Sequence, residues 1–278
     1  MSYVEIPLVR LLGSAFLIVL AVAVSYRRKL DLEKDLAWGA LRAAVQLVAI
    51  GYVLVLLFHT ESQALVLVAL AVMLTVASWT AARRVTHGPG WRVLMPRAAL
   101  AIGVAFCVAL IPVLAWIIPV RPMLEPRYAV PIGGMIMASG MNVVALTLER
   151  IMSTAHQRAI AIEQALALGA SPDQAMQSTQ RQALRAAMTP TINSLLTLGL
   201  VQLPGMMTGQ ILSGTSPLQA VRYQLVIMYQ LVAVAALAGA LAAWFAQRAL
   251  FDRRGRLRRF AGAGTAVKSA EERRRERR

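Results

Sequence analysis

The sequence has few of the residues on which hydrolytic enzymes and disulfide-stabilised proteins depend. Cys107 is its one cysteine, so no internal disulfide and no cysteine-based metal site is expected, and we expect it to be a small packing residue. The histidines, His59, His87 and His156, are scattered, and neither HExxH nor GxSxG occurs. These absences argue against a membrane protease or phosphatase.

Lysine is also scarce, and its positions exclude a nucleotide-binding loop. The P-loop pattern GxxxxGK[ST] needs a glycine directly before a lysine. Lys29, Lys34 and Lys268 are the only lysines, and none of them follows a glycine. We therefore expect no ATP hydrolysis, no catalytic residue and no bound cofactor in this chain.

Charged residues make up only 15% of the chain, whereas 58% is hydrophobic and the mean hydropathy is +0.60. A helix needs about 20 mostly apolar residues to cross a bilayer, and charge-free stretches of about that length recur. The sequence predicts an all-α polytopic membrane protein with about seven transmembrane helices. We place the spans at about 8–26, 43–60, 62–82, 98–120, 128–148, 188–212 and 223–247.

The first and the sixth of these spans have alternatives. LIVLAVAVS in the first is similar to the apolar part of a signal peptide, but Glu5 and Arg10 precede it and a basic cluster follows it, which favours an uncleaved helix. The sixth lies in a charge-free run from Ala186 to Val221. That run is too short for two full spans and a loop, so we expect one full helix followed by a broken or re-entrant piece.

Lysine and arginine alternate along the chain in a way that predicts its orientation. With the N-terminus outside and the C-terminus cytoplasmic, only four basic residues lie outside: Arg10, Arg121, Arg127 and Arg222. We expect a permease domain over 1–247 with a cytoplasmic coupling region at 149–187. A basic tail, 248–278, should be disordered beside membrane lipid. The positive charge follows from topology, so nucleic acid is not an expected partner.

The coupling region predicts two helices that meet at a tight corner. The stretch ERIMSTAHQRAIAIEQALALGA, residues 149–170, should continue the fifth span as one helix that ends at Gly169. The sequence Ser-Pro-Asp-Gln at 171–174 begins a second helix with a serine cap, a proline in the first turn and a glutamine three residues after the cap. We expect this helix to end near Met188, where Thr189-Pro190 would start the sixth span by the same device.

The corner resembles the EAA loop of ABC transporter permeases, a cytoplasmic helix that docks into a groove on a separate ATPase subunit. The matching stretch is EQALALGASPDQA, residues 163–175, although Gln164 stands where the pattern has alanine and Pro190 lies further on than in importer permeases. The resemblance implies an ATPase-coupling contact formed by Glu163, Ala165, Leu168, Gly169, Ala170, Ser171 and Pro172.

A wider resemblance covers the C-terminal half. VPIGGMIMASGMNVVALTLER at 130–150 and a segment at 190–229 that contains LPGMMTGQIL closely resemble the FetB/YbbM family, proposed iron exporters with plant relatives linked to aluminium tolerance. This implies a homodimer in the bacterial cytoplasmic (inner) membrane, bound to an ABC ATPase that uses ATP and Mg. The implied cargo is an iron ion, a related metal or a chelate, moved outward.

Polar residues and a helix break predict the substrate path. Backbone that leaves a helix at membrane depth is tolerated where it is buried in protein or faces a water-filled cavity. Alternatively, the break is a packing kink in which Thr and Gln bond between helices and the methionines fill gaps. The predicted path residues are Ser139, Asn142, Pro204, Gly205, Met206, Met207, Thr208 and Gln210.

Asn142, Glu149, His156 and Glu163 follow one another at intervals of seven, which keeps them near one stripe of a continuous helix. Glu149 and His156 are weak metal candidates. Alternatively, Glu149 caps a helix or pairs with an arginine, and His156 is merely exposed. A secondary transporter or channel without an ATPase is the alternative function; it explains the helix break but leaves the corner without a partner.

Overall fold

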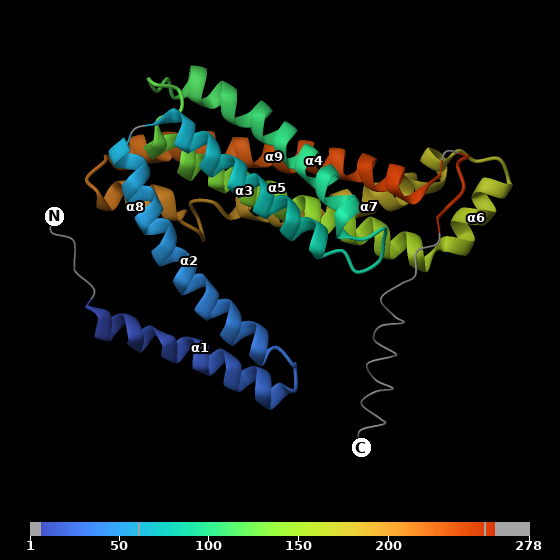
Figure 1. Ribbon diagram of the computed structural model, residues 1–278, viewed down its shortest axis with the longest axis horizontal. Coiled ribbons are helices and arrows are strands. Elements are labelled where there is room, and N and C mark those ends of the chain that lie inside the picture. The colour runs from blue at the N-terminus through green and yellow to red at the C-terminus, as the bar shows by residue number, and fades with distance from the viewer. Residues whose placement is uncertain (1–6, 61, 253, 259–278) are drawn as a thin grey trace. The chain divides into compact units, whose positions relative to one another are not determined.

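The computed structural model describes residues 7–60, 62–252 and 254–258, and most of these residues are helical (Figure 1). The helices are α1 (Leu8–Arg28), α2 (Glu33–Thr60), α3 (Gln63–Arg83), α4 (Trp91–Pro112), a π-helical turn (Val113–Ile117), α5 (Pro126–Gln157), α6 (Ala159–Ala167), α7 (Pro172–Thr197), α8 (Gly205–Leu212) and α9 (Pro217–Leu250). In the described part, 5 helices are long and apolar enough to cross a membrane: α2, α3, α4 with its π-helical turn, α5 and α9. The predicted all-α membrane class is confirmed, while seven spans and the orientation stay predictions.

The chain forms two compact units, residues 1–62 and 63–278. In the first unit α1 packs against α2. The turn between them is held by the Ser25 hydroxyl, which donates to the Glu33 carboxylate at 2.8 Å and accepts from the backbone N–H of Leu32 at 3.3 Å. Lys29 ends α1 in the left-handed conformation, with φ of 53°.

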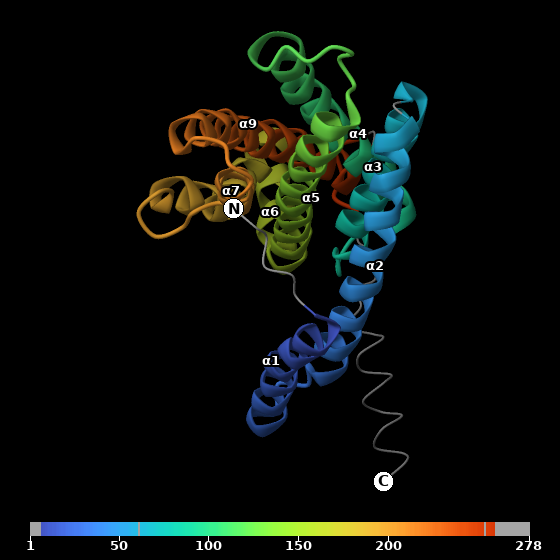
Figure 2. The same cartoon turned by 90° about the vertical axis from the view of Figure 1, so that its left-hand side faces the viewer.

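In the second unit α5 and α9 form the centre. Each of them packs against α4 and α7, and they pack against each other (Figures 1 and 2). Gly239 of α9 lies tightly against both α5 and α7, because a Cβ atom there would lie 3.0 Å from Val143 Cγ1 and 2.6 Å from Leu184 Cδ1. Small residues let membrane helices approach this closely, and buried alanines, among them Ala235 and Ala242, continue the contact along α9.

Two predicted helix boundaries are wrong. The fifth span does not continue into the corner as one helix, because α5 ends at Gln157 and Arg158 is not helical, with φ of −103° and ψ of 20°. The absence of glycine and proline permits a continuous helix but does not enforce one, and α6 packs instead against α7. The polar stripe on α5 therefore ends at His156.

Thr189-Pro190 does not start a new helix, since α7 runs through both residues to Thr197. The Thr189 hydroxyl donates to the Arg185 carbonyl at 2.9 Å, as a threonine inside a helix does. Proline removes one donor from the helix but did not break it here.

The sixth span breaks earlier than predicted. Its helix ends at Thr197, a turn follows over 198–204 with Gly199 at φ of 79°, and Pro204 is the N-cap of the short helix α8, which packs against α9. In place of the expected full helix followed by a broken piece, the structure has the end of α7, a turn and the 8-residue helix α8.

Two further predictions concern Cys107 and the C-terminal tail. Cys107 is exposed, so the prediction that it is a packing residue is wrong. Helix α9 extends to Leu250, and beyond it Phe251 pairs with Leu257. The rest of the predicted tail lies outside the described residues.

Candidate substrate path and coupling elbow

A cavity of about 350 Å³ lies between α5, α7, α8 and α9. It is lined by five of the eight predicted path residues: Ser139, Asn142, Pro204, Gly205 and Met206. Residues separated by more than sixty positions in the sequence thus meet at one cavity, because the turn at 198–204 brings the start of α8 back toward α5. The sequence predicted that polar residues of the fifth span and the helix break at 204–205 line one path, and this geometry is compatible with that prediction.

The cavity has polar lining residues that sequence reasoning missed. Thr191 and Ser194 lie three residues apart on one face of α7, and Gln202 lies in the turn. Gln224 on α9 is buried, and its Oε1 atom has no hydrogen-bond partner in the described part of the chain. Polar side chains in an otherwise charge-free run were the available signal for all four residues.

The other predicted path residues lie on α8 outside the cavity lining. The Thr208 hydroxyl donates to the Pro204 carbonyl at 3.1 Å, so it is engaged within its own helix. Gln210 is partly buried, and its Oε1 atom is unpartnered among the described residues. Met207 is also partly buried on this short helix.

The predicted corner is present and is made by two complementary caps. Gly169, with φ of 93°, ends α6. The Gly169 N–H donates to the Leu166 carbonyl and the Ala170 N–H donates to the Ala165 carbonyl, both at 3.0 Å. Ser171 begins α7 with a capping box, since its hydroxyl accepts from Gln174 N–H at 3.2 Å and the Gln174 side chain accepts from Ser171 N–H at 2.9 Å. We call residues 163–174 the elbow.

The elbow is fixed to the bundle but exposes its tip. The side chain of Gln180 donates to Gln247, which in turn donates to Asp173, so the first turns of α7 are joined to the end of α9. Leu168, at the tip, is 89% exposed. An exposed leucine on a rigidly held corner is suited to contact another protein.

The C-terminal turn, residues 251–252 and 254–258, contributes to the elbow in a way that the sequence did not reveal. A groove of about 570 Å³ is lined on one side by Glu163, Ala170 and Pro172, and on the other by residues 254–257. Gly255, with φ of 74°, lies directly against Pro172. The Asp252 carboxylate closes this turn by accepting from the backbone N–H groups of Arg254 and Arg256 at 2.8 and 2.9 Å.

The same device recurs at the other end of the bundle. The sequence GASPDQ at 169–174 has the pattern GxSPxQ, and so does GTSPLQ at 214–219, between α8 and α9. Gly214, with φ of 97°, ends α8, and Ser216 caps α9 by accepting from Gln219 N–H at 3.4 Å. Each corner places a left-handed glycine two residues before a serine cap.

Glu149 and His156, the weak metal candidates, lie in a cluster that includes the α3–α4 connection. Glu149 accepts from the backbone N–H and the hydroxyl of Thr86, both at 2.8 Å. Because the hydroxyl proton is used in that bond, the 2.8 Å contact from Thr86 Oγ1 to His87 Nδ1 places a hydrogen on Nδ1. Glu149 thus holds the connection, which supports its alternative role as a capping group.

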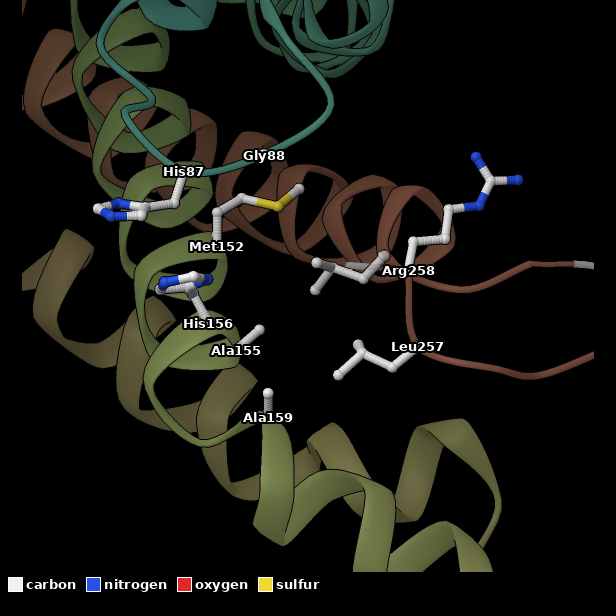
Figure 3. Close-up of a pocket in the computed structure, with 9 residues that line it drawn as sticks. His87, Gly88, Met152, Ala155, His156, Ala159, Leu257 and Arg258 are labelled. Atoms are coloured by element: carbon white, nitrogen blue, oxygen red, sulfur yellow. The ribbon is translucent and has the colours of Figure 1, made fainter. Parts of the chain in front are cut away.

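The rings of His87 and His156 lie one above the other (Figure 3). Their centroids are 5.0 Å apart, and their planes are tilted by 31°. They lie at the edge of an apolar pocket of about 210 Å³ into which Met152, Ala155 and Leu257 point. Within residues 7–60, 62–252 and 254–258, no group of three or more His, Cys, Asp or Glu side chains is placed to hold a metal ion.

Comparison with known proteins assigns the family. The chain is 40% identical to the UPF0014 membrane protein YjkA of Bacillus subtilis over 225 residues, 79% of this chain and 86% of the relative. It is 34% identical to FetB of Escherichia coli K12, named a "probable iron export permease protein", over 245 residues, 87% of this chain and 91% of the relative. It is 35% identical to Protein ALUMINUM SENSITIVE 3 of Arabidopsis thaliana over 218 residues, 78% of each chain.

No solved structure matches the chain. The family described as "Uncharacterised protein family (UPF0014)" matches residues 8–251, which include every described helix. The resemblance read from the sequence is confirmed, and the chain belongs to this family of membrane proteins.

Proposed function

We propose that this chain is the membrane-spanning permease subunit of an ABC transporter that exports iron or a related metal. In this proposal a separate ABC ATPase subunit binds ATP and Mg and docks on the elbow, and two copies of the chain form a homodimer in the bacterial inner membrane. The name of the Escherichia coli relative supports the cargo and the direction. The chain itself supplies the path and the mechanical contact.

The elbow is the observation that carries the proposal. A secondary transporter has no need for a doubly capped cytoplasmic corner whose leucine is 89% exposed. Because Gln247 links Asp173 to Gln180, force applied to the corner reaches both α7 and α9. These two helices also line the polar cavity, so a push at the elbow can change the shape of the cavity.

The test compares two substitutions at the tip, Leu168→Glu and Leu168→Met, in affinity pull-downs from detergent-solubilised native membranes. Leu168 is exposed, so neither change should affect folding. We expect a P-loop ATPase to co-purify with the unmodified chain and with Leu168→Met, and to be lost with Leu168→Glu. Iron added to the complex should raise the rate of ATP hydrolysis.

Absence of any ATPase from the unmodified chain's pull-down would refute the ABC permease assignment and favour a secondary transporter or channel. An ATPase that co-purifies but does not respond to iron would retain the architecture and remove iron as the cargo. An ATPase retained equally by both variants would show that the elbow tip is not the contact.

A further inference from the structure

A second hollow lies at the end of α5 and α9 opposite the elbow. Its volume is about 480 Å³, and its polar lining residues are Glu125, Tyr128, Gln219, Arg222 and Tyr223. Helix α5 begins here and runs for 32 residues toward α6, a length of about 48 Å at 1.5 Å per residue. This exceeds the hydrocarbon thickness of about 30 Å, so the hollow and the elbow belong to opposite faces of the membrane.

The starts of α5 and α9 supply these side chains. Glu125 and Tyr128 are three residues apart at the start of α5, and Arg222 and Tyr223 follow Gln219 by three and four residues on α9. Tyr128 on α5 and Tyr223 on α9 line the same hollow. Two phenol groups from different helices therefore line a hollow that a carboxylate also lines.

The two remaining oxygen-bearing side chains are not used for capping. Glu125 is the N-cap residue of α5, but its side chain makes no capping hydrogen bond. Gln219 occupies the position that Gln174 has at the elbow, yet only its backbone N–H takes part in the cap of α9. The carboxylate and the amide are therefore available to the hollow that they line.

We propose that this hollow is a binding site for a trivalent hard cation such as ferric iron, held by the oxygens of Tyr128, Tyr223 and Glu125. Hard cations prefer oxygen ligands. A phenol binds a cation firmly only after its proton has left, and a strongly polarising ion favours the deprotonated oxygen. Binding therefore releases one proton from each tyrosine, and two phenolates with one carboxylate balance a charge of +3.

Helix α5 connects this site with the cavity described above, and this link rests on the proposed export function. At 100° per residue, Tyr128, Met135, Ser139 and Asn142 fall within an arc of about 60° on α5. Met135, Ser139 and Asn142 line the cavity between α5, α7, α8 and α9, whereas Tyr128 lines the proposed cation site. The positive charge of Arg222 in the same hollow opposes retention of a cation, which suits a site from which the ion is released.

The test uses the colour of ferric phenolate. The full chain, purified in detergent at neutral pH, is titrated with ferric nitrilotriacetate while visible absorbance is recorded. We expect a phenolate-to-iron charge-transfer band that saturates, that gallium(III) abolishes and that zinc(II) leaves unchanged. Tyr128→Phe and Tyr223→Phe should each lower the apparent affinity at least about tenfold. Tyr229→Phe is the matched control, because Tyr229 is on the same helix, is 64% exposed and does not line the hollow.

A chain without the band, or a band that survives in both hollow variants, would overturn the site. Circular dichroism of each variant shows whether a lost band reflects misfolding, and a folded variant without the band supports the site. The ATPase pull-down is independent of this measurement. If the band appears but no ATPase co-purifies, the cation site is retained and the proposed transporter class is refuted. If an ATPase co-purifies but no band appears, the transporter class is retained and the cation site is refuted.

Discussion

The crossing of α5, α7 and α9 at Gly239 leads to a quantitative prediction. In Gly239→Ala the added methyl group would lie 2.6 Å from Leu184 Cδ1 and 3.0 Å from Val143 Cγ1. Leu184 can move its side-chain end, but Val143 is buried and its β-branched side chain is stiff. Overpacking of this kind costs about 1–3 kcal/mol, whereas replacing glycine by alanine in a helix gains about 0.5–1 kcal/mol.

Gly103→Ala is the matched control, because the same methyl group on α4 would meet its nearest neighbour, Leu74 Cδ2, at an ordinary 3.5 Å. Both variants gain helix propensity, so the difference between them isolates the steric cost. We expect Gly239→Ala to be about 1–3 kcal/mol less stable than Gly103→Ala. The assay is denaturant unfolding in detergent followed by circular dichroism. Equal stability of the two variants would show that the helices do not cross this closely.

Three further predictions concern the elbow, the cavity and the C-terminal turn. Ser171→Ala removes the cap of α7 at a cost of about 0.5–2 kcal/mol, so amide hydrogen exchange in the first turn of α7 should quicken while α9 is unchanged. Asn142→Leu should abolish metal transport without affecting ATPase co-purification, since Asn142 lines the cavity and lies far from the elbow along α5; retained transport would remove it from the path. The backbone N–H of Arg256 lowers the pKa of Asp252 by donating a hydrogen bond to its carboxylate. The C-terminal turn should therefore be stable above about pH 4 and loosen as the pH falls through the lowered pKa. Limited proteolysis at several pH values should show this dependence in the unmodified chain and not in Asp252→Asn.

The elbow was predictable from the sequence because its chemistry is local. The glycine, the serine cap and the glutamine of the capping box are within six residues of each other, and each satisfies a neighbouring backbone group. The second GxSPxQ corner could have been found by the same reasoning. Its recurrence at 214–219 is visible in the sequence alone.

The helix breaks were less predictable because they depend on what packs against them. Arg158 leaves the helix without a glycine or proline, and Pro190 stays inside one. The surroundings of Gln224 and of Tyr223 were likewise hidden, since a polar residue in an apolar run does not show which helix will pack beside it. Sequence reasoning therefore recovered five residues of the cavity lining and none of the hollow lined by Tyr128 and Tyr223.

The length of α5 has a consequence for the partner that we propose for the elbow. The charge-free run of α5 ends at Leu148, but the helix continues for nine residues to Gln157. In a helix perpendicular to the membrane these residues add about 14 Å, whereas the headgroup layer adds only about 5–8 Å on each side. In this orientation the elbow would stand in bulk water beyond the lipid headgroups, so the proposed ATPase subunit would need no membrane-binding surface of its own to reach it.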